Sequence, residues 1–105
     1  MAVDRIKIDR EKLADFCRRN HIRRLALFGS VLREDFRPDS DVDFLATFER
    51  RAGWDISDHF DMEEELAGIV GRPVDIVCRS TIESSRNRFY KEEILSTAEP
   101  CYAAR

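Results

Sequence analysis

The chain has 105 residues, of which 43% are hydrophobic and 37% are charged, and its formal net charge is −3. A chain of this length predicts one domain, residues 1–105, that buries a single hydrophobic core without disulfides or metals as staples. The slightly acidic balance argues against a general nucleic-acid-binding surface, and the sequence shows neither an apolar run of membrane-spanning length nor the pattern of a signal peptide. Three cysteines without a CxxC spacing, Cys17, Cys78 and Cys101, predict reduced thiols in a cytoplasmic protein.

The first half of the chain alternates helical and extended patterns. Asp9 is suited to cap a helix, and the apolar residues after it recur at helical spacing. His21 is expected in the turn that follows this helix. The expected elements are helices over about residues 10–20 and 30–35 and strands over about residues 24–28 and 41–48.

The second half predicts a long helix, a strand and a further helical segment. These elements are a helix from near Ser57 to a stop at Gly71, a strand over residues 73–78, and a helix that begins at Ser80 and keeps its helical character until Pro100. Ser80 and Glu83 have the spacing of a capping box. The acidic run 63–65 is interpreted as the solvated face of the long helix, and His59 as a surface residue. The residues after Pro100 follow no readable pattern.

The turn after the first strand has the features of a phosphate-binding site. Gly29 lets the backbone approach a ligand closely, and a helix that begins at Ser30 presents free N–H groups. Those donors and the helix dipole favour a phosphate group, to which the hydroxyl of Ser30 adds a hydrogen bond. Taken alone, a Gly-Ser pair is also compatible with an ordinary turn and N-cap.

Two carboxylates, Asp41 and Asp43, open the second strand, and ten residues separate Ser30 from Asp41. Side chains two residues apart on a strand lie on the same face, about 6.6 Å apart along it. At an effective dielectric constant of about 20, their repulsion is about 2.5 kcal/mol, and a divalent cation between them would reverse its sign. The spacing therefore predicts a metal site, although a DxD motif alone also occurs in solvated loops.

Two other motif assignments fail. Asp39, Asp41 and Asp43 match the first ligand positions of an EF-hand loop. Phe44, however, stands where that loop needs glycine, and Arg50 stands where it needs the bidentate glutamate. A P-loop is excluded because no Gly-Lys-Ser/Thr follows a glycine-rich run. A phosphate cradle facing paired carboxylates instead indicates metal-assisted phosphoryl or nucleotidyl transfer.

Asp75 is a lone acid within the apolar strand pattern Val-Asp-Ile-Val. Aspartate is disfavoured in strands, and a carboxylate that loses water needs a compensating partner. The residues alone allow an edge-strand or N-terminal position in which this carboxylate stays in water.

The Gly29-Ser30 pair, the ten intervening residues and the Asp41-Val42-Asp43 motif resemble the signature of the DNA polymerase beta nucleotidyltransferase superfamily. Arg33, three residues after Ser30, and the lead-in over residues 37–40 resemble its smallest branch, the minimal nucleotidyltransferases (MNT proteins) encoded beside HEPN-domain partners. The resemblance covers nearly the whole chain. One departure is Glu34, because many relatives have glycine directly after the arginine.

The predicted elements and the resemblance together imply an α/β (α+β) fold, a small mixed β-sheet flanked by about four helices, as in the palm of polymerase beta. The resemblance implies transfer of a nucleoside monophosphate from a nucleoside triphosphate, with ATP as donor and one or two Mg²⁺ ions. It assigns catalysis and metal binding to Asp41, Asp43 and Asp75, with Asp75 on a strand beside the other two acids. It assigns nucleotide binding to Gly29, Ser30 and Arg33.

The resemblance also implies that a tyrosine of a HEPN-domain toxin is the acceptor, which makes this chain an antitoxin in a hetero-oligomer. Two rival functions remain open: a non-catalytic antitoxin that only covers its partner, and a small-molecule nucleotidyltransferase, for whose additional acceptor domain the chain leaves no room. Candidate partner contacts in the C-terminal segment are Arg86, Arg88, Phe89 and Tyr90, a composition typical of interface anchors. The alternative is that Phe89 and Tyr90 pack the last helix on the sheet.

Overall fold

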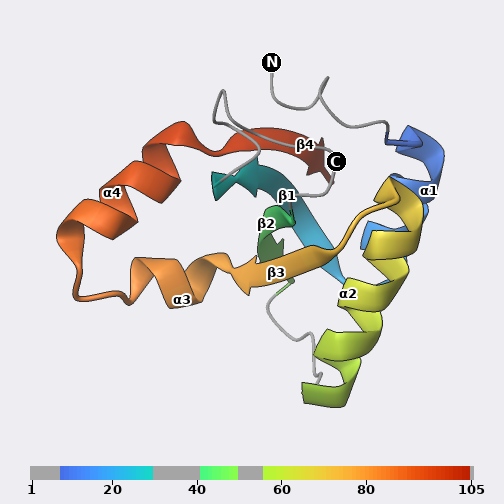
Figure 1. Cartoon of the computed structure of the whole chain (residues 1–105). Coiled ribbons are helices and arrows are strands. Elements are labelled where there is room, and N and C mark those ends of the chain that lie inside the picture. Colours follow the sequence, from blue (N-terminus) through green and yellow to red (C-terminus); the bar gives the residue numbers. More distant parts are fainter. Residues whose placement is uncertain (1–7, 30–40, 50–55, 105) are drawn as a thin grey trace.

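The computed structural model describes residues 8–29, 41–49 and 56–104 (Figure 1). In chain order these ranges hold α1 (Arg10–Arg19), β1 (Ile22–Phe28), β2 (Val42–Phe48), α2 (Ile56–Val70), β3 (Val74–Cys78), α3 (Arg79–Glu83), α4 (Arg88–Thr97) and β4 (Glu99–Ala103). The expected mixed α/β architecture is confirmed. The helix expected over residues 30–35 lies outside the described residues.

The four strands form one mixed sheet in the order β3-β2-β1-β4. β1 pairs antiparallel with both β2 and β4, whereas β2 and β3 run parallel. A parallel pair needs a long crossover connection, and α2 lies in the chain between β2 and β3. This topology places β3 and β4 at the two edges of the sheet.

The larger core lies between α1, α2 and one face of the sheet (Figure 1). α1 begins with Asp9 as its N-cap, whose Oδ1 accepts hydrogen bonds from the backbone N–H groups of Glu11 and Lys12 at 3.0 and 3.1 Å. Alternate residues of each strand face this core because side chains alternate along a strand. The buried residues of this core are Leu13, Phe16, Cys17, Ile22, Leu25, Leu27, Val42, Phe44, Ala46, Met62, Leu66, Val70 and Ile76.

A smaller core lies on the opposite face of the sheet, against α3 and α4. It consists of Phe28 from β1, Leu45 from β2, Ile82 from α3 and Ile94 from α4, all of which are buried. Ile82 and Ile94 anchor the two short helices, with the partly buried Leu95 of α4 packed against them, and in Figure 1 α3 and α4 extend from the sheet as a lobe. The acidic positions of β2 and β3 belong to this second face.

The helical character expected between Ser80 and Pro100 is confirmed, but it is divided between two helices, α3 and α4, which residues 84–87 separate. α3 begins one residue earlier, with Cys78 as its N-cap and no side-chain capping bond, so the predicted capping box does not form. Polar side chains then interrupt the helix by bonding the backbone. The hydroxyl of Ser85 accepts from the N–H of Asn87 at 3.2 Å, and the Oδ1 of Asn87 accepts from the N–H of Tyr90 at 3.1 Å, which begins α4.

β4 is an element that no local pattern predicted, and it contains Pro100. Proline cannot donate to a strand ladder, so it is tolerated on an edge strand. Pro100 pairs with Ala26 of β1, beside a register shift between Leu25 and Ala26. The strand therefore exists because a distant strand pairs with it.

The other expected bounds agree with the structure to within two residues, and His21 forms the expected turn, with φ at 58°. Cys17 is buried, Cys78 and Cys101 are half-buried, and all three are free thiols. Within the described ranges, no helix is long and apolar enough to cross a membrane.

Candidate active site

The end of β1 lies against the start of β2, and this contact requires glycine. Phe28, the last residue of β1, pairs with Asp43 in the antiparallel register. Gly29 follows with φ at +77°, in the left-handed region that favours glycine. A Cβ atom on Gly29 would lie 2.4 Å from Oδ2 of Asp43, closer than van der Waals contact allows. The sequence thus places a bare backbone beside the carboxylate of Asp43.

Asp75 lies beside Asp43 on the neighbouring strand. The two residues are partners in the parallel register of β2 and β3, so their side chains emerge on the same face of the sheet, with the strands about 4.8 Å apart. Asp43 is half-buried and Asp75 is exposed on the edge strand. Both interpretations of Asp75 therefore hold, because the carboxylate reaches water at the sheet edge and also neighbours the strand that carries the Asp-Val-Asp motif.

Asp41 lies directly before β2 and is exposed. The N–H of Val42 donates to the carbonyl oxygen of Pro73 at 2.9 Å, which ties the start of β2 to the start of β3. The three acids thus belong to one end of the sheet. Among the described residues, however, no three His, Cys, Asp or Glu side chains gather closely enough to form a metal-ligand set by themselves.

Mg²⁺ fits a site of this composition when a nucleotide supplies the remaining ligands. The ion prefers oxygen ligands and commonly binds through one or two carboxylates together with substrate phosphates and water. Asp41 and Asp43 offer such carboxylates, and the carboxylate of Asp43 lies directly against the backbone of Gly29. Ser30 and Arg33, predicted to bind the nucleotide, lie outside the described residues, and their roles stay predictions.

Glu63 contradicts its interpretation as part of a solvated helix face. Its Oε2 accepts a 2.7 Å hydrogen bond from the backbone N–H of Ile76, the residue after Asp75, and lies 3.4 Å from Nε2 of His59. The side chain of Glu63 is only 16% exposed. Helical spacing was the available signal, because Glu63 stands four residues after His59 and three before the buried Leu66.

Residues 10–98 of the chain match a family model described as nucleotidyltransferase domain. The protein adenylyltransferase MntA of Thermococcus cleftensis is 31% identical to the chain over 74 residues, which cover 70% of this chain and 73% of that protein. The range matched by the family model contains β1, β2 and β3 with Asp41, Asp43 and Asp75, and it ends directly before β4.

Three solved structures share the fold. One is described as a minimal nucleotidyltransferase, with 34% identity, a TM-score of 0.63 and coverage of 89% of this chain and 87% of the other. A toxin–antitoxin structure with AMP-PNP has 17% identity, a TM-score of 0.66 and coverage of 93% and 76%. A complex of the tri-AMPylated HEPN toxin of Shewanella oneidensis with its MNT antitoxin has 16% identity, a TM-score of 0.58 and coverage of 90% and 70%.

Proposed function

We propose that this chain, which belongs to the nucleotidyltransferase domain family, transfers AMP from ATP to a tyrosine hydroxyl of a HEPN-domain protein and so acts as the antitoxin of a toxin–antitoxin pair. That it is a nucleotidyltransferase follows from its family. The donor ATP, the dependence on Mg²⁺ and the tyrosine acceptor are the proposal. The three free thiols support a reducing compartment, the cytoplasm, as its location.

The names of the related proteins support this choice of donor and acceptor. The curated relative is a protein adenylyltransferase, one structural neighbour contains AMP-PNP, and another pairs an MNT antitoxin with an AMPylated HEPN toxin. ATP is the donor that matches all three names. A HEPN-domain protein is the matching acceptor.

The observation that carries the proposal is the placement of Asp43 between Gly29 and Asp75. Gly29 leaves backbone, without a side chain, on one side of this carboxylate, and Asp75 lies on the next strand on the other side. In the proposed reaction the phosphate chain binds on the Gly29 side of this acid and the acceptor hydroxyl on the Asp75 side. This is the arrangement that a two-substrate transfer requires.

In the proposed reaction the acids divide the work. Asp41 and Asp43 would hold Mg²⁺, which when bound neutralises charge on the triphosphate and on the pyrophosphate that leaves. Asp75 accepts the proton of the tyrosine hydroxyl while the tyrosine oxygen bonds to the α-phosphorus of ATP and the bond between the α-phosphorus and pyrophosphate breaks. Gly29, Ser30 and Arg33 bind the β- and γ-phosphates through backbone N–H, hydroxyl and guanidinium groups.

The test is an intact-mass measurement of the cognate HEPN-domain protein after incubation with this chain, ATP and Mg²⁺. We expect the partner to gain the mass of one or more AMP groups, and a chelator to prevent the gain.

Asp43→Asn should abolish transfer without lowering the melting temperature, because it removes one of several neighbouring negative charges. Asp75→Asn should keep much of the ATP affinity in calorimetry and still lose transfer.

Three results would contradict the proposal or part of it. A stable complex in which the partner gains no mass would identify a non-catalytic antitoxin. Modification of small alcohols without any partner protein would identify a small-molecule nucleotidyltransferase. Transfer by Asp43→Asn at the wild-type rate would remove Asp43 from the site.

A further inference from the structure

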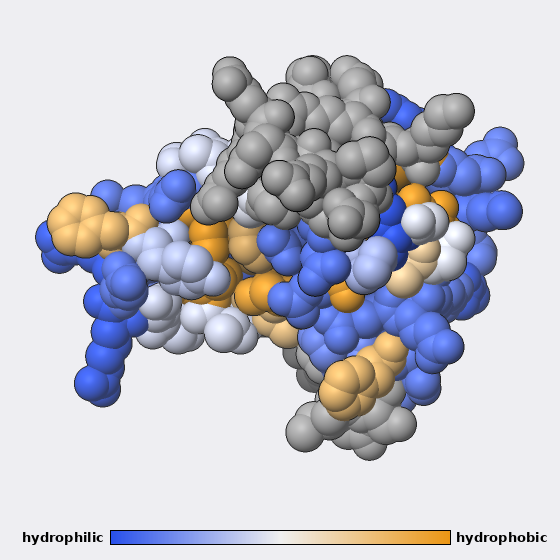
Figure 2. Space-filling view, viewed as in Figure 1, coloured by the Kyte–Doolittle hydropathy of each residue, from blue (hydrophilic) through white to orange (hydrophobic). Residues whose placement is uncertain are grey.

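The start of α4 exposes two aromatic side chains that the cores do not use. Phe89 is 85% exposed and Tyr90 is 46% exposed. Of the alternatives left open by the sequence, packing on the sheet is wrong for Phe89, because the buried contact of α4 is made by Ile94. Figure 2 shows hydrophobic surface at the free tip of the lobe formed by α3 and α4, surrounded by hydrophilic side chains.

The backbone presents these aromatic residues on an ordered turn. Asn87 caps α4 through its side chain, which accepts from the N–H of Tyr90, and the N–H of Lys91 donates to its carbonyl oxygen at 3.0 Å. Phe89 lies in the chain between Asn87 and Tyr90, which one of these hydrogen bonds joins. Because the backbone that carries Phe89 is already ordered, little backbone conformational entropy is lost when a partner covers this residue.

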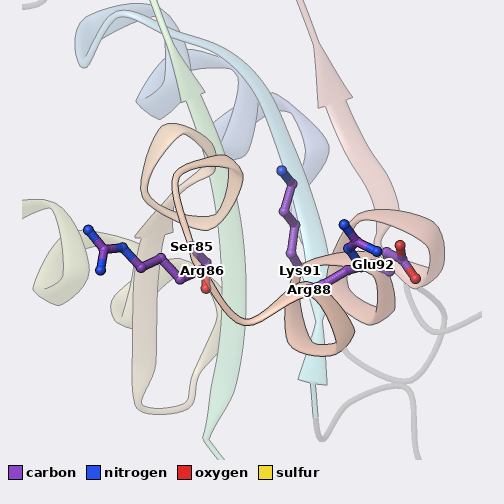
Figure 3. Close-up of a pocket in the computed structure, with 5 residues that line it drawn as sticks. All are labelled: Ser85, Arg86, Arg88, Lys91 and Glu92. Atoms are coloured by element: carbon purple, nitrogen blue, oxygen red, sulfur yellow. The ribbon is translucent and has the colours of Figure 1, made fainter.

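Cationic residues flank the aromatic pair along the chain. Ser85, Arg86, Arg88, Lys91 and Glu92 line a hollow of about 310 Å³ (Figure 3). In Figure 3 Arg86 and Arg88 point in opposite directions and Lys91 points away from both, so the three cations do not converge on one point. This divergence disfavours a site for a single small anion. It favours a broad surface with several separate charged contacts.

A protein fits this surface better than a nucleic acid does. The chain as a whole carries a net charge of −3, and Glu92 and Glu93 directly follow Lys91 along α4. A phosphate backbone would meet these acids as well as the cations. An acidic protein surface around an apolar socket would instead pair with the cations at its rim and cover the aromatic residues at its centre.

We propose that residues Arg86, Arg88, Phe89, Tyr90 and Lys91, here called the α4 patch, form the docking surface for the protein acceptor, and that the acceptor meets it with an acidic surface around an apolar socket. The proposal rests on the proposed function, because it names where the acceptor of that reaction is held. The patch positions the acceptor and takes no part in the chemistry.

The test is the affinity of the full chain for the cognate HEPN-domain protein, measured by calorimetry with Phe89→Ser. We expect binding at least tenfold weaker, with an unchanged melting temperature and unchanged affinity for ATP, because Phe89 contacts neither core. Phe60→Ser is the matched control, since Phe60 is also exposed, at 64%, but lies on α2. This control should bind the partner like the wild type.

The charge complementarity is tested by Arg86→Glu together with Arg88→Glu. This double variant should also weaken partner binding at least tenfold, and wild-type binding should weaken with rising salt. Wild-type affinity in Phe89→Ser would overturn the proposal, as would binding of an RNA oligonucleotide that the double variant loses while it keeps the partner.

Failure of the reaction and failure of the docking surface are distinguishable. If the wild-type chain binds the partner but transfers no AMP to it, and Phe89→Ser breaks the complex, the docking surface is supported and the proposed reaction is contradicted. If AMP is transferred and Phe89→Ser leaves the KM for the partner unchanged, the reaction stands and the α4 patch falls.

Discussion

At the scale of single residues, Gly29 and Asp43 depend on each other. Gly29 combines a φ of +77° with a position in which an added Cβ would lie 2.4 Å from Oδ2 of Asp43. A side chain there would have to displace either the strand end or the carboxylate. Gly71 has nearly the same backbone conformation, with φ at +74°, but a Cβ there would meet nothing within 4 Å. A substitution at either glycine causes backbone strain, but only a substitution at Gly29 also displaces the carboxylate of Asp43, so a comparison of the two positions separates these effects.

Gly29→Ala should reduce AMP transfer at least tenfold, whereas Gly71→Ala should leave it unchanged. Both variants should lose about 1–2 kcal/mol of unfolding free energy, because L residues are strained in the left-handed region. Denaturant titrations and the intact-mass assay measure the two effects on the same samples. Equal transfer by the two variants would show that the close approach of Gly29 to Asp43 has no role in the site.

At the scale of elements, β3 is an edge strand that carries Asp75 of the candidate site, and a side chain of α2 bonds to its backbone. The carboxylate of Glu63 accepts from the N–H of Ile76 at 2.7 Å and is in turn paired with His59 at 3.4 Å. An edge strand has backbone groups that no neighbouring strand satisfies, so a side chain from a helix can occupy one of them. Because Ile76 follows Asp75, this bond fixes the strand where it carries Asp75.

Glu63→Ala should lower kcat more than it changes the KM for ATP, because it loosens Asp75 and spares Gly29 and Asp43. It should also cost about 1.5–3 kcal/mol of unfolding free energy, the usual range for a hydrogen bond to a charged group. Glu63→Gln keeps an acceptor oxygen at this position and should restore much of kcat. A stability loss in Glu63→Ala with an unchanged kcat would assign Glu63 a structural role alone.

At the scale of the whole molecule, the buried thiol of Cys17 and the half-buried thiol of Cys101 link folding to pH. Burial, and secondarily the charge of Cys101, raises the pKa of Cys17 from its ordinary value of 9.0 to about 12. Burial likewise raises the pKa of Cys101 to about 12, against the opposing effects of a hydrogen bond within its own residue and of the charge of Arg10. Cys17 belongs to α1 and Cys101 to β4, and both pack in or against the larger core, so their ionisation is linked to the unfolding of that core.

The unfolding free energy should fall as pH rises from about 9 to about 12. Above pH 9 the unfolded chain releases these two protons while the folded chain keeps them, so the unfolded state binds fewer protons and stability decreases with pH. Each thiol contributes a slope of up to about 1.4 kcal/mol per pH unit. Urea titrations across this range measure the slope for the wild type.

Cys17→Ala isolates the contribution of this thiol to the slope. It should lower stability at neutral pH through the lost packing, but its stability should decline less steeply between pH 9 and pH 12. A slope identical to that of the wild type would mean that the thiol of Cys17 reaches water in the folded state.

Local patterns predicted most of the fold and the residues of the candidate site. The helical spacing of α1 and α2 and the short apolar runs of β1, β2 and β3 gave bounds within two residues, because the burial of one face of an element repeats at that element's own period. The site motif was also local, since Gly29, Asp41 and Asp43 belong to two segments joined by one connection. These features depend on the order of residues alone.

Only the tertiary structure decided which distant groups meet. β4 became a strand because β1 offers it an edge, and α3 and α4 separated because Ser85 and Asn87 bond the backbone between them. Glu63 left the solvent because an edge strand offers it an N–H donor, and Phe89 stayed exposed because Ile94 makes the buried contact of α4. For β4, Glu63 and Phe89 the outcome depends on a contact between segments that are far apart in the chain, or on the lack of one, which the periodicity of a single segment does not encode. The separation of α3 from α4 instead depends on local bonds between side chains and backbone, which hydrophobic periodicity does not reveal either.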